Sequence, residues 1–298
     1  MSEARIITGN NVELCARFNA FLGEGPVWDE DQQALWWVDI FDRLVHRFDP
    51  KSGEDECYTF DEPVGAVALR GSGGLVVVLA SRVVTWAAGS PRREVVAQLA
   101  GEEARHRLND ARCDHNGNLW VGSVSEDKQP NAASLYRLDT AGRLQPILRG
   151  VTISNGLDWT PSGDEFYYID SPTQSIDVFR FAADSGRLDD RRVAVSIAST
   201  DGLPDGMTVD ADGFIWVALY GGGRVRRYAP DGMLDMEIQL PVSQVTSCTF
   251  GGPDLMDLYI TTGRKDLTDD QVRAQPLAGA LFRCRPGVRG RLPQPFGG

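Results

Sequence analysis

The stretch LPDGMTVDADGFIWVALYGGG, residues 203–223, decides the fold that this sequence predicts. Asp205 stands near its start, between Pro204 and Gly206, and a short apolar segment follows. The turn Asp-Ala-Asp-Gly, residues 210–213, then leads into the apolar run FIWVAL. Two β-rich runs joined by an Asp/Gly turn are typical of a buried β-hairpin.

Five further stretches of the chain repeat this pattern. They are GEGPVWDEDQQALWWVDI from residue 23, PVGAVALRGSGGLVVVLA from residue 63, RLNDARCDHNGNLWVGSV from residue 107, ISNGLDWTPSGDEFYYID from residue 153 and VTSCTFGGPDLMDLYITT from residue 245. Each is followed by another strand-like run, such as VHRFDP or SLYRLDTAG. The period of roughly 40 to 50 residues is that of β-propeller blades. The sequence therefore predicts an all-β, six-bladed β-propeller.

We expect residues 1–298 to form a single propeller domain. Its blades should lie at approximately 13–60, 61–100, 101–150, 151–200, 201–242 and 243–286, followed by a loose tail at 287–298. The apolar run from Val12 to Phe18 has no hairpin partner of its own. We expect it to pair with the last blade as the outer strand, because this closes the ring and covers an exposed edge.

Composition and charge exclude several classes of protein. The formal net charge of -12 argues against a nucleic-acid partner, because phosphate binding needs a basic surface. No run approaches the roughly 20 apolar residues of a membrane helix, and MSEARIITGN lacks the pattern of a signal peptide. The five cysteines are scattered and have no CxxC spacing, so they suggest neither a disulfide framework nor a thiolate zinc site. We expect a cytoplasmic protein.

Several common catalytic motifs are missing from the sequence. The three histidines have no HExxH or HxH spacing, which makes a histidine-bound zinc site improbable. There is no G-x-S-x-G nucleophile elbow. The triple glycine at 221–223 lacks the Lys-Ser/Thr of a phosphate-binding loop and reads as a turn.

The six repeats place their first residues at one mouth of the propeller channel, because the first strand of each blade lines it. Counting back from the second strand finds Glu24, Val64, Asn109, Asn155, Asp205 and Ser247. Converging carboxylates and amides repel one another unless a cation lies between them, and a divalent cation with oxygen ligands suits this set. Glu24 and Asp205 would balance its charge, and Asn155 would add a neutral oxygen. The alternative is that these residues merely solvate a water-filled channel.

The loops after the second strands should face the same mouth. They contain residues 126–127, 170–171, 220–223 and 262–264. Arg107 lies two residues before Asn109 and so points the same way on an extended backbone. We therefore expect Arg107, Asn109 and Glu126 to flank the metal centre and to bind a small hydroxylated, carbonyl-bearing ligand. Arg107 could instead be an ordinary surface ion-pair partner.

Four motifs, taken in order, resemble a known family. They are LGEGPVW at 22–28, RLND at 107–110, SNGLDW at 154–159 and PDGM at 204–207. The chain resembles, over almost its whole length, the family of senescence marker protein, gluconolactonase and luciferin-regenerating enzyme, which includes regucalcin and bacterial sugar lactonases. The block SCTFGGPDLMDLYITTGRKDL at 247–267 looks especially like bacterial pentonolactone and hexonolactone hydrolases. Several relatives have Thr-Met where this chain has Ser123-Val124, so loop packing and substrate may differ there.

The resemblance implies one catalytic divalent metal in the channel and a sugar lactone as substrate. The implied metal ligands are Glu24, Asn155 and Asp205, and the implied substrate contacts are Arg107, Asn109 and an acidic residue at Glu126 or Asp127. The expected reaction is metal-dependent hydrolysis of the ester bond of aldonolactones, such as glucono-, xylono- or arabinonolactone, to the open-chain acid. In this hypothesis the metal polarises the carbonyl, and Asp205 is the general base that takes a proton from water.

Two rival functions stay open. One is a non-catalytic, calcium-binding regulatory propeller, and the other is a metal-dependent arylesterase or phosphotriesterase. An oxygen-only ligand set accepts Ca, Mg, Mn, Fe or Zn, so the sequence does not choose the metal. It also leaves open which sugar lactone is bound and how many chains assemble.

Overall fold

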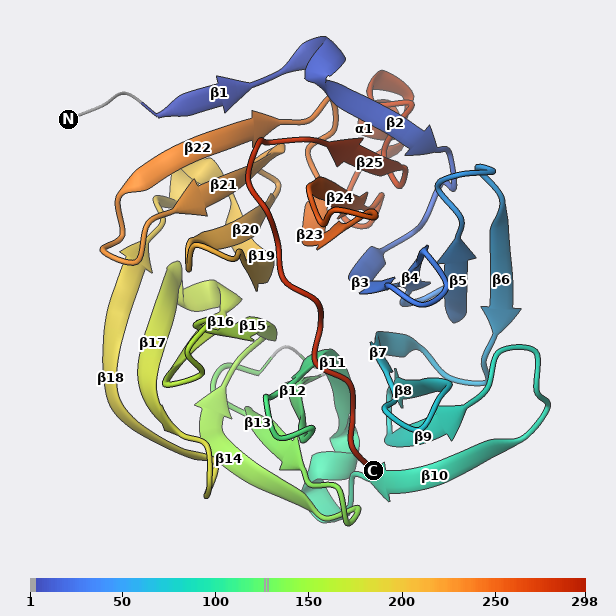
Figure 1. Ribbon diagram of the computed structural model, residues 1–298, viewed down its shortest axis with the longest axis vertical. Helices are drawn as coiled ribbons and strands as arrows, with labels where there is room; N and C mark the ends of the chain where they lie inside the picture. The colour runs from blue at the N-terminus through green and yellow to red at the C-terminus, as the bar shows by residue number, and fades with distance from the viewer. Residues whose placement is uncertain (1–3, 126, 128) are drawn as a thin grey trace.

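Six β-sheets surround a central axis, and the chain is a six-bladed β-propeller (Figure 1). The computed structural model describes residues 4–125, 127 and 129–298. Each blade is a sheet whose strands follow one another from the axis to the rim. In blades one to three these are β3 (Gly23–Asp29), β4 (Ala34–Asp39), β5 (Leu44–Phe48), β6 (Asp55–Thr59); β7 (Val64–Leu69), β8 (Leu75–Leu79), β9 (Arg82–Trp86), β10 (Arg93–Gln98); and β11 (His106–Cys113), β12 (Leu119–Ser125), β13 (Ala133–Leu138), β14 (Leu144–Val151).

The second half of the ring repeats this order. Its strands are β15 (Ser154–Trp159), β16 (Glu165–Asp170), β17 (Ser175–Ala182), β18 (Arg187–Ser196); β19 (Leu203–Val209), β20 (Ile215–Tyr220), β21 (Arg224–Tyr228), β22 (Leu234–Gln239); and β23 (Val245–Gly251), β24 (Asp257–Thr262), β25 (Leu281–Cys284). Short 3-10 helices lie at Gly9–Asn11, Gly101–Arg105, Ser171–Thr173 and Ser199–Asp201. The α-helix α1 (Asp269–Ala274) begins at a capping box formed by Thr268 and Gln271.

The N-terminal segment closes the ring as the sequence predicts. Strand β2 (Val12–Ala16) pairs antiparallel with β25 and becomes the outer strand of blade six. The preceding strand β1 (Arg5–Ile7) was not anticipated: it pairs in parallel with β22 and adds a fifth strand to blade five. The start of the chain therefore ties together the two blades on either side of the last blade interface.

A carboxylate organises the central turn of the stretch at 203–223. Asp210 accepts hydrogen bonds from the backbone N–H groups of Asp212 and Phe214 and from the indole N–H of Trp216 at 2.9 Å. Asp114 does the same in blade three, where the indole of Trp120 donates to it at 2.9 Å. Each carboxylate satisfies turn N–H groups while it fixes the first aromatic side chain of the second strand, so the hairpin and the core form together.

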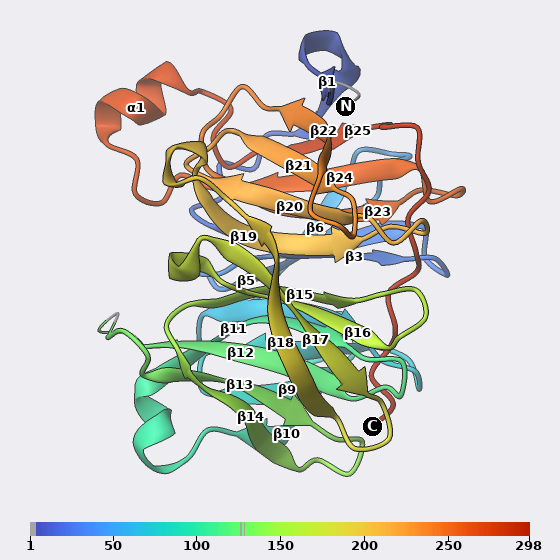
Figure 2. The ribbon, with the colours of Figure 1, turned by 90° about the vertical axis from the view of Figure 1, so that its left-hand side faces the viewer.

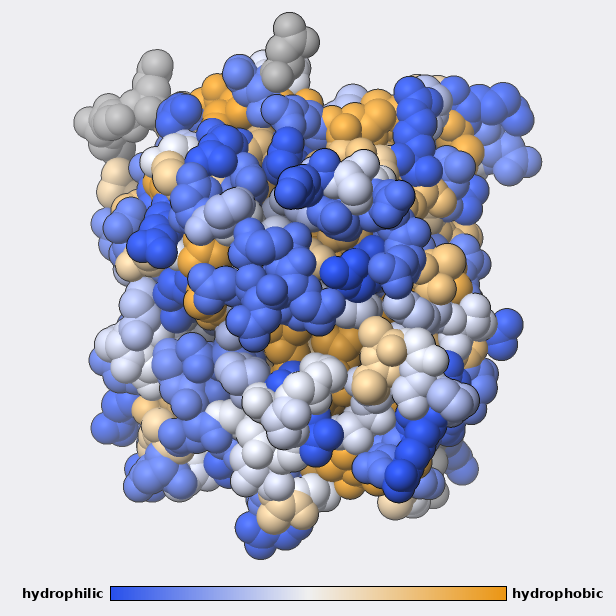
Figure 3. All heavy atoms as spheres, turned by 45° about the vertical axis from the view of Figure 1, so that its right-hand side comes forward, coloured by the Kyte–Doolittle hydropathy of each residue, from blue (hydrophilic) through white to orange (hydrophobic). Residues whose placement is uncertain are grey.

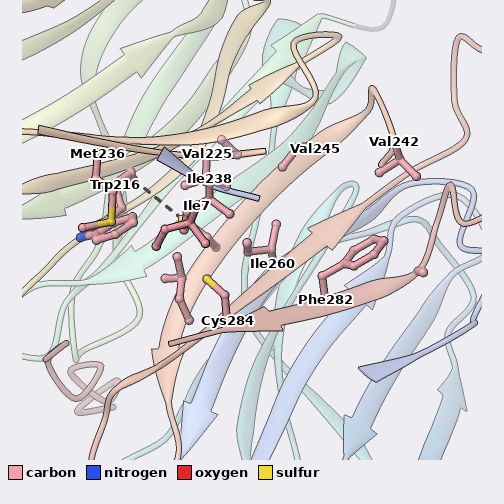
Figure 4. Packing of buried hydrophobic residues seen from close by; sticks show 14 of the residues in the cluster. Ile7, Trp216, Val225, Met236, Ile238, Val242, Val245, Ile260, Phe282 and Cys284 are labelled. Atoms are coloured by element: carbon pink, nitrogen blue, oxygen red, sulfur yellow. Dashed lines mark hydrogen bonds between the residues drawn. The ribbon is translucent and has the colours of Figure 1, made fainter. Parts of the chain in front are cut away.

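The apolar core lies between the blades. Figure 4 shows the largest cluster, where residues of blade five face residues of blade six across their shared interface. Trp216 is fully buried there and meets Phe250 edge-on, with ring centroids 5.5 Å apart. Ile7 from β1 enters the same cluster and is only 5% exposed. Burial of this kind, at roughly 25 cal/mol per Å² of apolar surface, holds each blade to the next.

The C-terminal tail is ordered, and our expectation of a loose tail was wrong. It crosses the face of the ring along a diameter from blade six to blades two and three (Figure 1). The Arg291 guanidinium donates to the carbonyl oxygens of Val209 and Trp159, at 3.0 and 2.7 Å. Phe296 is 0% exposed in the core between blades two and three, and its backbone bonds to Leu69. Backbone hydrogen bonding and one buried aromatic ring outweigh the Arg/Pro/Gly composition of this segment.

The outer surface is mostly hydrophilic, with apolar side chains in small separate patches on the face that Figure 3 shows. Within the described residues, no helix is long and apolar enough to cross a membrane. Figure 2 shows the tail along one face of the ring and α1 at the opposite face. The two mouths of the channel are therefore different environments.

Candidate functional site

A break in strand pairing turns the candidate residues toward the axis. In β11, β15 and β19, two residues of the inner strand face one residue of its neighbour, and the pairing resumes beyond them. The first residue of each such bulge is Asn109, Asn155 or Asp205. In blade one the break follows Glu24 directly. Bulges re-aim side chains next to functional sites, and here the same device recurs in four blades.

Glycines beside the bulges allow adjacent inner strands to approach closely. A Cβ at Gly156 would lie 2.6 Å from the carbonyl oxygen of Asp205, and one at Gly65 would lie 2.7 Å from that of Asn109. Real Cβ atoms do not approach backbone so closely, so these positions accept only glycine without movement of the strands. The glycine of one blade thus sets the position of the polar residue in the next.

These polar residues lie around one cavity of about 470 Å³ at the mouth opposite the tail. Glu24, Asn109, Asn155 and Asp205 are each 7% exposed and contribute polar groups from the inner strands, with Arg107 beside them. The rest of the lining is Leu22, Ile40, Phe41, Pro63, Val124, Ser125, Ile153, Ser171, Leu203, Tyr220, Lys265 and Asp266. The cavity is large enough for a small molecule of the size of a monosaccharide.

A chain of hydrogen bonds fixes the two amides. An Arg107 guanidinium N–H donates to Asn109 Oδ1 at 2.8 Å, and Asn109 Nδ2 donates to Asn155 Oδ1 at 2.9 Å. Asn155 Nδ2 donates to Ser171 Oγ at 2.8 Å, and the Ser171 hydroxyl donates to the carbonyl oxygen of Pro204 at 2.7 Å. Because every link has one donor and one acceptor, the orientation of each amide is defined. Asn155 Oδ1 therefore points away from Ser171. It accepts one hydrogen bond, from Asn109, and has a second lone pair that can bind a cation.

The two carboxylates are buried close to one another. Burial raises the pKa of Glu24 well above its ordinary value, and the negative charges of Asp205 and Asp110 raise it further. Burial also raises the pKa of Asp205, and the negative charge of Asp110 raises it further, while the Lys265 ammonium lowers it. Glu24 accepts one hydrogen bond, from Gly25 N–H at 3.0 Å. Within the described residues Asp205 accepts none, so both groups are poorly compensated as anions.

A third carboxylate, Asp110, lies beneath the first two. Burial raises its pKa to about 6, against the opposing charge of Arg112. Arg112 itself donates to Asp158 at 2.9 Å and to the carbonyl oxygen of Met207 at 3.2 Å. Arg291 of the tail donates to the other oxygen of Asp158 at 3.2 Å. This arginine–aspartate–arginine cluster separates the cavity from the tail side of the channel.

The rim includes Tyr220, which was expected there, and Lys265 and Asp266, which sequence reasoning missed. Tyr220 donates through its hydroxyl to the carbonyl oxygen of Lys265 at 2.8 Å, and the Lys265 ammonium pairs with Asp266 at 2.8 Å. These two charged residues directly follow the loop expected at 262–264. Asp110 was missed because aligning the repeats selects one residue per blade. The bulge in β11 instead turns two consecutive residues, Asn109 and Asp110, toward the channel.

Three expected positions are not among the cavity residues, and a fourth lies outside the described residues. Glu126 lies outside the described residues, and Asp127 is exposed and is not among the residues that line the cavity. Ser247 packs against Gly206, where a Cβ would meet its Oγ at 2.2 Å, and it lines a smaller space deeper in the channel. Val64 is fully buried in the apolar core. The mouth is therefore polar on four of its six inner strands.

The donor set suits a divalent cation that prefers oxygen. In the part of the chain that the structure describes, no three His, Cys, Asp or Glu side chains gather as metal ligands. The carboxylates of Glu24 and Asp205 would bind a cation and neutralise its charge, and the oriented oxygen of Asn155 would be a further ligand. Because burial leaves both carboxylates undercompensated, a divalent cation would remove the electrostatic penalty that the protein otherwise bears.

Fold and site together define a class: a six-bladed propeller with an oxygen-donor cavity on its axis. Comparison with known proteins narrows this class. Residues 22–264 match the family described as the SMP-30/gluconolactonase/LRE-like region. The chain belongs to this family.

Three relatives span nearly the whole chain. A Bacillus subtilis protein, YvrE, whose name assigns it provisionally to the sugar lactone lactonases, is 38% identical and covers 96% of this chain and 98% of its own. Regucalcin of Gallus gallus is 37% identical over 93% of this chain and 95% of its own. The crystal structure of a calcium-binding regucalcin from Agrobacterium tumefaciens superposes with a TM-score of 0.93 at 25% identity, covering 99% of both chains.

Proposed function

We propose that this protein hydrolyses the ester bond of sugar acid lactones with the help of one divalent cation. The observation that carries the proposal is the convergence of Glu24, Asn155 and Asp205 with Arg107 and Asn109 on one cavity. The name of the Bacillus subtilis relative supports lactones as the substrate class. An aldonolactone fits the size of the cavity and matches its mixture of anionic, cationic and amide groups.

Each polar residue then has a role in the reaction. A divalent cation held by Glu24, Asn155 and Asp205 would polarise the lactone carbonyl. Arg107 and Asn109, held together by their hydrogen bond, orient the hydroxyl groups of the ring. Asp205 takes a proton from a water molecule while the water oxygen bonds to the carbonyl carbon. The bond between the carbonyl carbon and the ring oxygen then breaks. The proton passes to the ring oxygen, which leaves as the hydroxyl of the open-chain acid.

Substitution of Asp205 tests this proposal most directly. Asp205→Asn keeps the shape of the side chain but accepts no proton, and we expect kcat to fall by about 10² or more in a pH-drop assay on glucono-, xylono- and arabinonolactone. Asp31→Asn, at an exposed turn, is the matched control. Full lactonase activity in a folded Asp205→Asn protein would remove Asp205 as the base.

The metal part of the proposal has a separate test. Glu24→Gln removes one of the two buried negative charges, so calorimetric titration with Ca²⁺, Mg²⁺, Mn²⁺ or Zn²⁺ should give a clearly weaker affinity than for the unaltered protein. Equal affinity would take Glu24 out of the ligand set. Activity that survives complete chelation would exclude a metal-dependent reaction altogether.

A calcium-binding regulatory protein is the second candidate function. The similarity to regucalcins, one of which is described as a calcium-binding protein, favours it. This function predicts tight Ca²⁺ binding without turnover of any lactone, whereas the lactonase predicts turnover that chelation abolishes. Including phenyl acetate and a phosphotriester in the same assay separates both from an arylesterase or a phosphotriesterase.

A further inference from the structure

One side of the cavity mouth is apolar and partly exposed. Leu22, Ile40, Phe41 and Pro63 line the cavity on blade one and at the start of blade two, and we call this set the apolar wall. Phe41 is 38% exposed, and Phe21, whose ring meets it edge-on at 5.9 Å, is 39% exposed. They are two of the nine large apolar side chains exposed in the described chain, and Phe41 is exposed within the cavity lining itself, which requires an explanation.

The apolar wall is held in place by its backbone. The Asp39 carboxylate accepts hydrogen bonds from the N–H groups of Phe21 and Leu22, at 2.7 and 3.1 Å. The N–H of Ile40 donates to Leu22 at 3.0 Å, and the N–H of Val64 donates to Ile40 at 3.1 Å. The wall is therefore preorganised across two blades, and a ligand need not order it on binding.

Glu24, Asn109, Asn155 and Asp205 form the polar floor of the cavity. The apolar wall meets this floor at Arg107. The Arg107 guanidinium carbon lies 5.5 Å from the centre of the Phe41 ring, while the same side chain donates to Asn109. A ligand that reaches Asn109 with its polar part would thus lay its next atoms against Phe41. Tyr220, Lys265 and Asp266 add polar lining, and the backbone N–H of Lys265 donates to Phe21 O, next to the wall. Val124, Ile153 and Leu203 add apolar lining elsewhere, so the cavity presents the apolar wall beside polar groups.

The apolar wall discriminates between substituents. A hydroxyl group placed against the wall loses its hydrogen bonds with water and finds no partner there, which is unfavourable. A methylene group at the same place gains from leaving water. An aldonolactone hydroxylated at every carbon does not use the wall.

We propose, on the basis of the lactonase function above, that the cavity takes lactones whose ring carries an apolar substituent, which packs against Phe41 and its neighbours. The ester group of such a lactone lies on the polar floor, and its alkyl or aryl substituent lies along the apolar wall. Lactones of this class are hydrolysed with a lower KM than their unsubstituted parent.

The test is a series of γ-lactones whose carbon-4 substituent lengthens from hydrogen to butyl, compared with xylono-1,4-lactone. We expect kcat/KM to rise about two- to fourfold per added methylene, mostly through KM. In Phe41→Ser the gain per methylene should fall below about twofold, whereas Phe41→Leu should keep it. Met233→Ser, a change at an exposed apolar residue far from the cavity in blade five, should behave as the unaltered protein.

A binding measurement supports the kinetic one. The matching γ-lactams resist hydrolysis, so their inhibition constants against xylonolactone turnover report affinity alone, and these should fall with chain length in the same proportion. If chain length changes neither KM nor the inhibition constants while aldonolactones are hydrolysed, the inference is wrong and the proposed function stands. If neither class of lactone is hydrolysed, the proposed function itself fails.

Discussion

Asn109 Nδ2 donates to Asn155 Oδ1 at 2.9 Å, and this one bond joins the residue proposed to bind substrate to the residue proposed to bind the metal. Arg107 lies at one end of the chain of hydrogen bonds, and Ser171 lies at the other. The orientation of the Asn155 amide is consequently set from a neighbouring loop and not by the amide alone.

We expect Ser171→Ala to weaken metal binding although Ser171 is not itself a proposed ligand. Loss of its hydroxyl leaves Asn155 Nδ2 without its acceptor and lets the amide rotate, so its oxygen no longer points reliably to the cation. Loss of a group that orients a ligand costs about ten- to a hundredfold in metal affinity. Calorimetry measures this, with the exposed Ser185→Ala as control. An unchanged affinity would show that Ser171 does not orient the ligand.

The pH dependence of stability should reveal the half-buried Asp110 carboxyl beneath the site. Burial raises the pKa of Asp110 to about 6, from an unfolded value near 4. The folded protein therefore holds a proton that the unfolded chain releases, and its stability falls as the pH rises from about 4 to about 6. Asp110→Asn removes this loss and should stabilise the metal-free protein by about 1 to 2 kcal/mol above that range.

Chemical denaturation of both proteins at several pH values checks this expectation. The difference in free energy of unfolding should grow between pH 4 and 6 and then level off. Asp31→Asn, at an exposed turn, should show no such growth. A constant difference across this range would mean that Asp110 titrates normally.

Gly156→Ala should damage the site through the backbone. Its Cβ would lie 2.6 Å from Asp205 O and 2.8 Å from Met207 N, so β19 must move away from β15. We expect a loss of about 2 kcal/mol or more in stability together with weaker metal binding, because overpacking of this kind typically costs 1 to 3 kcal/mol. Gly71→Ala is the matched control, since its Cβ would find no atom closer than 3.4 Å. Thermal unfolding and metal titration of the two variants should separate them clearly.

Phe296→Ala should lower stability without changing substrate affinity. The ring is 0% exposed between blades two and three, and truncation of a buried phenylalanine costs about 3 to 5 kcal/mol. The cavity lies at the other mouth of the channel, so KM should stay the same at temperatures where the variant is folded. Leu292→Ala, at a tail residue 38% exposed, should cost much less. A change in KM would indicate that the tail communicates with the cavity.

The sequence was sufficient for the ring and for most of the polar residues at its axis. Repeats of an Asp/Gly turn and an apolar strand predict blades, and a fixed place in each repeat predicts which residues meet. It was insufficient where a single residue alters the pairing: Asp110 enters the channel because a bulge shifts the register. Lys265 and Asp266 were missed because a loop after a strand has no periodic pattern, and their place depends on a backbone bond to Phe21 from blade one.

The C-terminal tail shows a second limit of prediction from sequence. Residues 287–298 have the composition of a disordered segment, and nothing in their spacing predicts that Phe296 fills a space between two distant blades. Such a contact depends on the shape of a surface that exists only after the ring has formed. Local pattern cannot report it.

The order of synthesis gives the tail a further meaning. Strand β2 cannot find its partner until β25 has been made, and Phe296 is made after every strand of the two blades that enclose it. Both contacts that close the ring therefore depend on residues made after the inner strands of all six blades. A nascent chain that has not yet reached residues 281–296 keeps an open edge, exposed to other chains and to proteases, so synthesis of this segment is what closes the ring.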